Sequence, residues 1–187
     1  MARPVGRRGE TRERILAVAL DLFVEHGARG TSLQMIADAL GVTKAAVYHQ
    51  FRTKEEILLA VVRPSLDQLM AAVVVAQAAE DPVRRRDLAV EGLVDAVLDH
   101  HRVLLVLQGD PGATEMLNNH PEIEATAGQL NLLLLGPEPG IARIVAVAMI
   151  FGGVMDLGRK ADRVGADRQV LRRELLAAAR RLLDVPA

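Results

Sequence analysis

Apolar residues recur at helical spacing along nearly the whole chain, and almost no segment alternates apolar with polar residues as a half-buried strand would. The β-branched run 73–75 lies inside an alanine-rich helical stretch. This pattern predicts an all-α fold of about nine helices and no sheet.

Glycine, proline and clusters of Asn or Asp interrupt the pattern and set the ends of the helices. The sequence predicts helices at 11–26, 33–40, 44–51, 54–80, 82–101, 103–108, 113–118, 121–135, 141–161 and 167–183. Pro64 is expected to kink or split the fourth of these near Val62, because proline has no N–H and its ring clashes with the preceding turn.

Charge is unevenly divided along the chain. Residues 1–54 hold nine Lys or Arg against five Asp or Glu, and residues 55–187 hold fourteen against nineteen, which gives the net charge of −1. A basic first part joined to an acidic second part is typical of a nucleic-acid-binding protein with a separate module.

The absence of cysteine excludes disulfides and thiolate metal ligands. A basic start precedes an apolar stretch over 15–24, but Asp21 interrupts it and no cleavage site follows, so a secretory signal is disfavoured. The longest uncharged apolar run, 144–155, is shorter than the roughly 20 residues that span a bilayer. We therefore expect a cytoplasmic protein with no membrane partner.

The strongest motif in the sequence is LQMIADALGVTKAAVYHQFR. Ile36 and Ala37 are predicted to face Val42 and Val47 across a turn at Gly41, where glycine takes a left-handed backbone at least cost. The second helix then exposes a short, donor-rich face that suits the major groove of DNA. That face consists of Thr43, Lys44, Ala45, Ala46, Tyr48, His49 and Gln50.

The longer stretch TRERILAVALDLFVEHGARGTSLQMIADALGVTKAAVYHQFRTKEEIL is similar to the N-terminal domain of the TetR family of transcriptional regulators. The matching features are the Ile-Leu-x-x-Ala-x-x-Leu-Phe helix, the glycines before Thr31, the Ile-Ala-x-x-Leu-Gly-Val turn and the run from Val47 to Leu58. The resemblance covers about residues 10–60. It implies a three-helix helix-turn-helix domain over 1–53, joined to a helical-bundle domain for effector binding and dimerisation over 54–187.

By matching position, the resemblance implies DNA contacts from Thr31, Ser32, Thr43, Lys44, Ala45, Tyr48, His49, Gln50 and Lys54. Arg7 and Arg8 precede the matching stretch and are candidates for a basic arm along the DNA backbone or minor groove. Thr31 and Ser32 are expected to cap the second helix and touch phosphate, and Lys54 is expected to bind phosphate from the next helix. Lys44 and His49 are the side chains best suited to base edges.

The second domain is expected to hold an apolar small-molecule effector. Phe151 is its only aromatic residue after position 60, so an aliphatic pocket is expected in place of an aromatic cage. Polar and methionine side chains within apolar helices are the candidate contacts: Met70, His100, His101, Gln108, Met116, Asn118, Asn131, Met149, Phe151 and Met155. The alternative is that they are ordinary core, helix-end or interface residues.

Nothing in the sequence favours catalysis, a cofactor or a metal. There is no His-Glu-x-x-His, no glycine-rich phosphate loop and no nucleophile elbow. Asp95 and Asp99 share one helical face near His100, which could be a metal or acid–base cluster but is more commonly a solvated face.

The last two helices are predicted to form the interface of a homodimer. An apolar stripe at helical spacing and a glycine pair that permits close backbone approach support this. The residues are Gly152, Gly153, Leu171, Leu175, Ala178 and Leu182. Twofold symmetry would set two recognition helices about 34–36 Å apart on a pseudo-palindromic double-stranded operator.

Three functions compete on these observations. The leading one is a DNA-binding repressor that a small molecule releases from its operator. The second keeps DNA binding but makes the protein an activator or gives it a protein partner. The third is a helical enzyme or binding protein that uses the helix-turn-helix only as scaffold.

Overall fold

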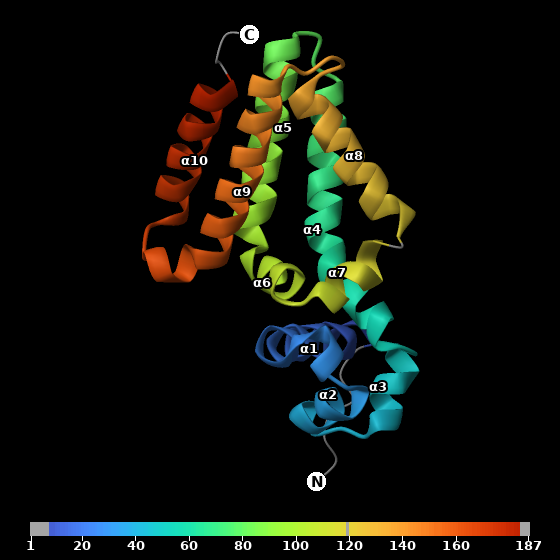
Figure 1. Cartoon of the computed structure of the whole chain (residues 1–187). Coiled ribbons are helices and arrows are strands. Elements are labelled where there is room, and N and C mark those ends of the chain that lie inside the picture. The colour runs from blue at the N-terminus through green and yellow to red at the C-terminus, as the bar shows by residue number, and fades with distance from the viewer. Residues whose placement is uncertain (1–7, 119, 184–187) are drawn as a thin grey trace. The chain divides into compact units, whose positions relative to one another are not determined.

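The computed structural model describes residues 8–118 and 120–183 (Figure 1). Within this range the chain forms helices and no strand, which confirms the all-α prediction. The helices are α1 (Arg8–Gly30), α2 (Leu33–Leu40), α3 (Lys44–Gln50), α4 (Lys54–Gln77), α5 (Pro82–Asp99), α6 (His101–Gly109), α7 (Pro111–Asn118), α8 (Pro121–Leu135), α9 (Ile141–Val164) and α10 (Arg168–Leu183).

The chain packs as two units. Unit 1 comprises Met1–Pro64 and Leu105–Asn119, and unit 2 comprises Ser65–Leu104 and His120–Ala187. The dividing points therefore fall inside α4 and α6. The first turns of α4, the end of α6 and α7 pack with the N-terminal helices, so this division lies beyond the boundary expected at residue 53.

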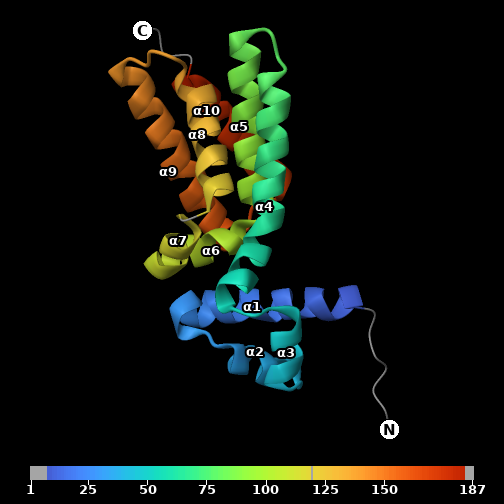
Figure 2. The same cartoon turned by 90° about the vertical axis from the view of Figure 1, so that its right-hand side faces the viewer.

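Unit 1 is built around α1, with α2 packed against it and α3 beside α2 (Figure 2). Its core is formed by fully or almost fully buried apolar residues from four helices. Ile15 and Phe23 come from α1, Ile36 from α2, Val47 from α3 and Leu58 from α4. Ile36 and Val47 are both fully buried there, as the helix-turn-helix motif predicts.

Unit 2 is a bundle in which α5, α9 and α10 lie side by side and α8 packs against α5 and α9 (Figure 1). One continuous apolar cluster runs through it and includes Val90, Leu93, Leu130, Ile150 and Leu176. α4 contributes to the same cluster from its second half.

Close helix contacts in unit 2 depend on glycines that the sequence did not single out. A Cβ on Gly92 would overlap the side chain of Ala72, and one on Gly158 would overlap Val97. The pair Gly152 and Gly153, expected to permit close approach, is exposed, and a Cβ at either position would meet nothing within 4 Å across the described chain.

A ladder of ion pairs joins α5 to α10. Arg172 donates to both carboxylate oxygens of Asp95 at 2.7 and 2.9 Å. Arg168 donates to Asp99 at 2.8 Å. Asp95 and Asp99 are therefore ion-pair partners of α10, although Asp99 stays exposed. The described residues include no group of three or more acidic or histidine side chains placed to hold a metal.

Pro64 does not split α4, which runs from Lys54 to Gln77. Val62 and Leu66, on either side of the proline, are both buried. Gly27, expected to end the first helix, does interrupt it with φ 74° and ψ 163°, but helical residues continue to Gly30.

Two helices are long and apolar enough to cross a membrane by length and composition. They are Lys54–Gln77 and the Ile141–Gly158 part of α9, with mean hydropathy 1.7 and 1.8. The sequence estimate missed them because it counted only uncharged runs. Core helices of a bundle pass the same test, and both helices contribute buried residues to unit 2, such as Val73 and Ile150.

Candidate nucleic-acid interface

One glycine in the turn and two capping hydroxyls at the helix starts define α2 and α3. Gly41 has φ 67° and ψ 35°, a left-handed conformation that glycine adopts without a Cβ penalty. Ser32 Oγ accepts from the Met35 amide at 3.2 Å, and Thr43 Oγ1 accepts from the Ala46 amide at 3.3 Å. Both helix starts are therefore capped as the sequence predicts.

α3 buries Val47 completely and turns nearly all its other side chains outward. The exposed residues are Thr43, Lys44, Ala45, Ala46, Tyr48 and His49. Gln50 is half-buried, with its Nε2 3.5 Å from Nδ1 of His49. Val42, expected in the core, is 37% exposed because it lies in the turn. The face predicted to meet DNA is thus free and polar.

Arg52 is a further cation of this surface that the sequence analysis did not select. Its guanidinium carbon lies 4.9 Å from the centroid of the Tyr48 ring, a cation–π distance. The signal was present in the sequence, because Tyr48 and Arg52 are four residues apart. Arg52 orients the Tyr48 ring and adds positive charge beside it.

Two residues predicted to contact phosphate, Thr31 and Lys54, instead bond to backbone carbonyls of their own unit in the structure. Thr31 is only 2% exposed, and its hydroxyl donates to the Gly27 carbonyl at 2.8 Å with the Leu22 carbonyl at 3.2 Å. Thr31 therefore ties α1 to the start of α2 and cannot reach a phosphate, which corrects the expectation. Lys54 Nζ donates to the Arg29 carbonyl at 3.2 Å, which uses one of its three N–H groups.

Arg7 and the side chain of Arg8, the candidates for a basic arm, lie outside the described residues. Arg8 begins α1. Both residues precede the stretch that resembles the family, and their contact with DNA stays a prediction.

Asp110 holds the end of α1 within unit 1. Its Oδ2 accepts from the Arg29 amide at 3.1 Å and its Oδ1 from the Gly112 amide at 2.8 Å. Burial opposes ionisation of this carboxyl, but these backbone hydrogen bonds outweigh it and lower the pKa of Asp110. The Arg29 side chain also pairs with Glu115 at 2.8 Å. The sequence predicted only a turn at 110–112.

The structure does not bring the predicted effector residues together. Met70 and Met149 are 40% and 57% exposed, and Asn131 is also exposed. His100 Nε2 lies 2.9 Å from Oε1 of Gln68, so it is partnered within its own unit.

The other members of this set are scattered. Phe151 and Met155 pack against the core of unit 2, where His101 is half-buried, and Met116 is half-buried in unit 1. The side chains of Gln108 and Asn118 lie outside the described residues. The sequence spacing of the candidate effector residues correctly predicted the helices that carry them. It did not predict the direction in which each side chain points.

The predicted dimer residues fall into two groups. Gly152, Gly153 and Ala178 are exposed and accessible to a partner. Leu171 and Leu182 are half-buried against the core of their own unit, and Leu175 is 7% exposed within that core. Leu175 is therefore corrected to a core residue.

A compact helix-turn-helix with an exposed polar second helix, in a chain whose other unit is a helical bundle, is an arrangement typical of DNA-binding proteins. Residues 15–61 match the profile described as "Bacterial regulatory proteins, tetR family". The N-terminal helix-turn-helix domain is therefore that of the TetR family.

Curated relatives match over part of their length. The transcriptional repressor KstR2 of Mycobacterium tuberculosis is 29% identical over 111 residues, covering 59% of this chain and 56% of that protein. The transcriptional activator FasR of Mycolicibacterium smegmatis is 35% identical over 91 residues, covering 48% and 42%. The chain thus matches about half the length of such relatives.

Solved structures share the fold over nearly the whole chain. The structure of KstR2 from Mycobacterium tuberculosis has a TM-score of 0.61 at 22% identity, covering 95% of this chain and 97% of that one. The probable transcriptional regulatory protein RHA5900 has a TM-score of 0.73 at 20% identity, covering 94% and 100%. At these identities the likeness establishes the two-part helical fold.

Proposed function

We propose that this chain is a sequence-specific transcriptional regulator, a repressor that a small molecule releases from a pseudo-palindromic DNA operator. The observation that carries the proposal is the exposed face of α3. Lys44, Tyr48 and His49 stand outward on a helix anchored by the buried Val47 and capped by Thr43. Such a helix can enter the major groove without unfolding any of its own contacts.

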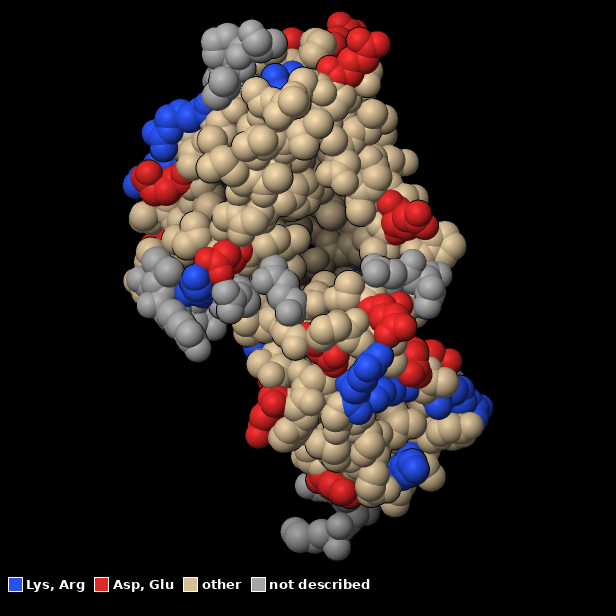
Figure 3. All heavy atoms as spheres, in the orientation of Figure 1, with Lys and Arg blue, Asp and Glu red and all other residues tan. Residues whose placement is uncertain are grey.

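The outer face of α9 supports a homodimer. Ile141, Val145 and Met149 follow one another at four-residue intervals and are 81%, 50% and 57% exposed. Figure 3 shows a broad face of unit 2 with few charged side chains across its middle. An apolar surface of this kind is usually covered in soluble proteins, and a second copy of α9 would cover it with twofold symmetry.

A small molecule can release DNA only if it binds the released state more tightly than the DNA-bound state. Names of the matched relatives support repression as the main outcome, since KstR2 is named a repressor. The name of FasR supports the alternative of activation. The relatives are named as regulators, so we assign no catalytic role and propose a cytoplasmic site of action.

The testing experiment is selection of random duplex DNA by the purified protein, with affinity followed across salt concentrations. We expect an enriched twofold palindrome and binding that weakens linearly in log affinity against log salt. An affinity that depends on salt but enriches no sequence would contradict sequence-specific regulation.

Two variants locate the interface. Lys44→Ala should lower operator affinity about tenfold or more, because it removes a cation positioned for base edges or phosphate. Lys160→Ala is the matched control, since Lys160 lies in unit 2 and pairs with Asp156 at 2.6 Å. Equal losses in the two variants, with both still folded by circular dichroism, would show that α3 does not read DNA.

A further inference from the structure

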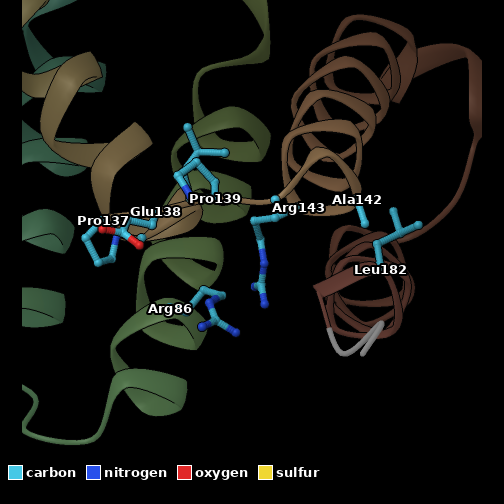
Figure 4. A pocket seen from close by; sticks show the side chains of 10 residues that line it. Arg86, Pro137, Glu138, Pro139, Ala142, Arg143 and Leu182 are labelled. Atoms are coloured by element: carbon cyan, nitrogen blue, oxygen red, sulfur yellow. The ribbon is translucent and has the colours of Figure 1, made fainter. Parts of the chain in front are cut away.

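A pocket at one end of unit 2 brings two arginines to a single cavity. The loop 136–140 between α8 and α9 lines a cavity of about 320 Å³ together with Arg86 of α5, Arg143 of α9 and Leu182 of α10. Figure 4 shows Arg86 and Arg143 extending into this space from two different helices. Two like charges at one cavity favour an anion between them.

The guanidinium of Arg143 has a hydrogen-bonding group that the described part of the protein leaves unsatisfied. Its Nη1 is buried and has no hydrogen-bond partner in the described part of the chain. Buried guanidinium N–H groups normally have an acceptor. Glu138 is the one carboxylate among the lining residues, and it does not satisfy this atom.

The neighbouring Arg85 shows the contrast. Its Nε and Nη2 both donate to the Ala79 carbonyl, at 3.1 and 2.8 Å, so its position is explained by the fold. The position of Arg143 is not explained in this way. Its helix also begins at Gly140 without a side-chain cap, which leaves the positive end of the α9 dipole beside the same cavity.

A second cavity adjoins the first and is mainly apolar. It has a volume of about 580 Å³ and shares Arg86, Gly136 and Pro137 with the arginine pocket. Its remaining lining residues are Gln77, Pro82, Arg85, Gln129, Leu132 and Leu133. Arg143 thus lines the first cavity, Arg86 lines both, and the leucines and Pro82 of the second cavity lie beyond Arg86.

We propose that these joined cavities bind an amphipathic organic anion. Its carboxylate or phosphate would accept hydrogen bonds from Arg143 and Arg86, and its apolar body would lie along Pro82, Leu132 and Leu133. Arg143 Nη1 gains its missing acceptor in this complex. That the anion is an effector rests on the proposed function, whereas its binding does not.

The test is calorimetric titration of the full chain, without DNA, with decanoate and with decyl phosphate. Decanol supplies the same apolar chain without charge, and inorganic phosphate supplies the charge without the chain. We expect at least one of the two amphipathic anions to bind at least about tenfold more tightly than decanol and than phosphate. The better of the two identifies which anionic group the arginines prefer.

Arg143→Gln should weaken that binding about tenfold or more, and Arg143→Lys should restore only part of it because lysine lacks the two-pronged donor. Arg181→Gln is the charge-matched control, at an exposed position of α10 outside both cavities. Thermal unfolding checks that each variant is folded. If the glutamine variant does not fold, the comparison of Arg143→Lys with Arg181→Lys replaces it.

Three outcomes would overturn the proposal: neither anion binds, decanol binds as tightly as the anions, or Arg143 and Arg181 variants lose affinity equally. Failure here with intact operator binding would leave the regulator proposal standing. Anion binding by a protein that selects no operator would support the anion site and contradict the regulator proposal. Release of selected operator DNA by the bound anion, lost in Arg143→Gln, would join the two.

Discussion

Unit 1 and unit 2 are held together by different kinds of contact. In unit 1, the side chains of Ser32 and Thr43 each accept from the backbone amide three residues further on and fix the starts of short helices. In unit 2, long helices are joined by pairs of side chains distant in sequence, such as Arg172 with Asp95. The first kind of contact has a fixed local spacing, and the second has none.

Their exposed surfaces differ in the same sense. α3 exposes a polar face of hydrogen-bond donors to solvent, and water satisfies these donors when no ligand is bound. α9 shows an apolar face that includes Val145 and Met149. The exposed polar face of α3 therefore costs unit 1 little stability. The exposed apolar face of α9, in contrast, would stabilise the protein further when a partner covers it.

The largest effect is expected from placing a charge on the apolar face of α9. Val145→Glu should weaken the proposed dimer at least about hundredfold, because twofold symmetry buries two carboxylates in one interface. Sedimentation equilibrium measures the dissociation constant directly. Operator affinity should fall with the dimer, although α3 is untouched.

The matched control for that variant is Val74→Glu on α4, where the valine is 65% exposed. We expect it to leave the dimer intact. If the two variants dissociate the dimer equally, or neither does, the outer face of α9 is not the interface.

An intermediate effect is expected from adding a side chain at the close contact between α4 and α5. A Cβ on Gly92 would overlap Ala72, so Gly92→Ala should force the helices apart and cost about 1–3 kcal/mol of unfolding free energy. Gly128→Ala on α8 meets nothing within 4 Å and should instead gain up to about 1 kcal/mol from helix propensity. Urea unfolding measures both, and a Gly92→Ala protein as stable as the Gly128→Ala one would refute the close contact.

What the sequence could predict follows the same division. The left-handed turn at Gly41 and the caps at Ser32 and Thr43 depend on residues within a few positions, so a pattern of fixed spacing reveals them. The prediction that Thr31 contacts phosphate was wrong because its hydroxyl bonds to carbonyl groups of α1, four and nine residues earlier. These bonds also keep the side chain away from the surface. A capping residue and a buried tie look alike in sequence.

In unit 2 the sequence predicted helices and little of their orientation. The stripe through Leu175 and Ala178 was real, but periodicity does not tell whether it faces a partner or the core of its own chain. The same limit hid the close contact of Gly92 behind the more conspicuous pair Gly152 and Gly153. Arg86 and Arg143 are far apart in sequence, and only folding brings them to one cavity.

The smallest effect concerns two carboxyls, one in each unit. In Asp110 and in Asp99, burial opposes ionisation, but hydrogen bonds outweigh it and the pKa is lowered. A folded pKa below the unfolded value near 3.9 means that the native state binds fewer protons there. Each carboxyl therefore stabilises the fold above about pH 4, and this contribution is lost as pH falls through the folded pKa.

Salt should separate these two carboxyls. Asp110 is held by neutral backbone amides, whereas Asp99 is held by Gln68 and by the charged Arg168. Because salt screens the guanidinium more than it weakens an amide hydrogen bond, adding salt should raise the pKa of Asp99 more than that of Asp110. Carboxyl titration by NMR at low and high salt measures both values in one sample. Arg168→Met should raise the pKa of Asp99, reduce its response to salt and leave Asp110 unchanged. Equal salt shifts in the two carboxyls would mean that the contrast between backbone-held unit 1 and ion-paired unit 2 does not extend to their electrostatics.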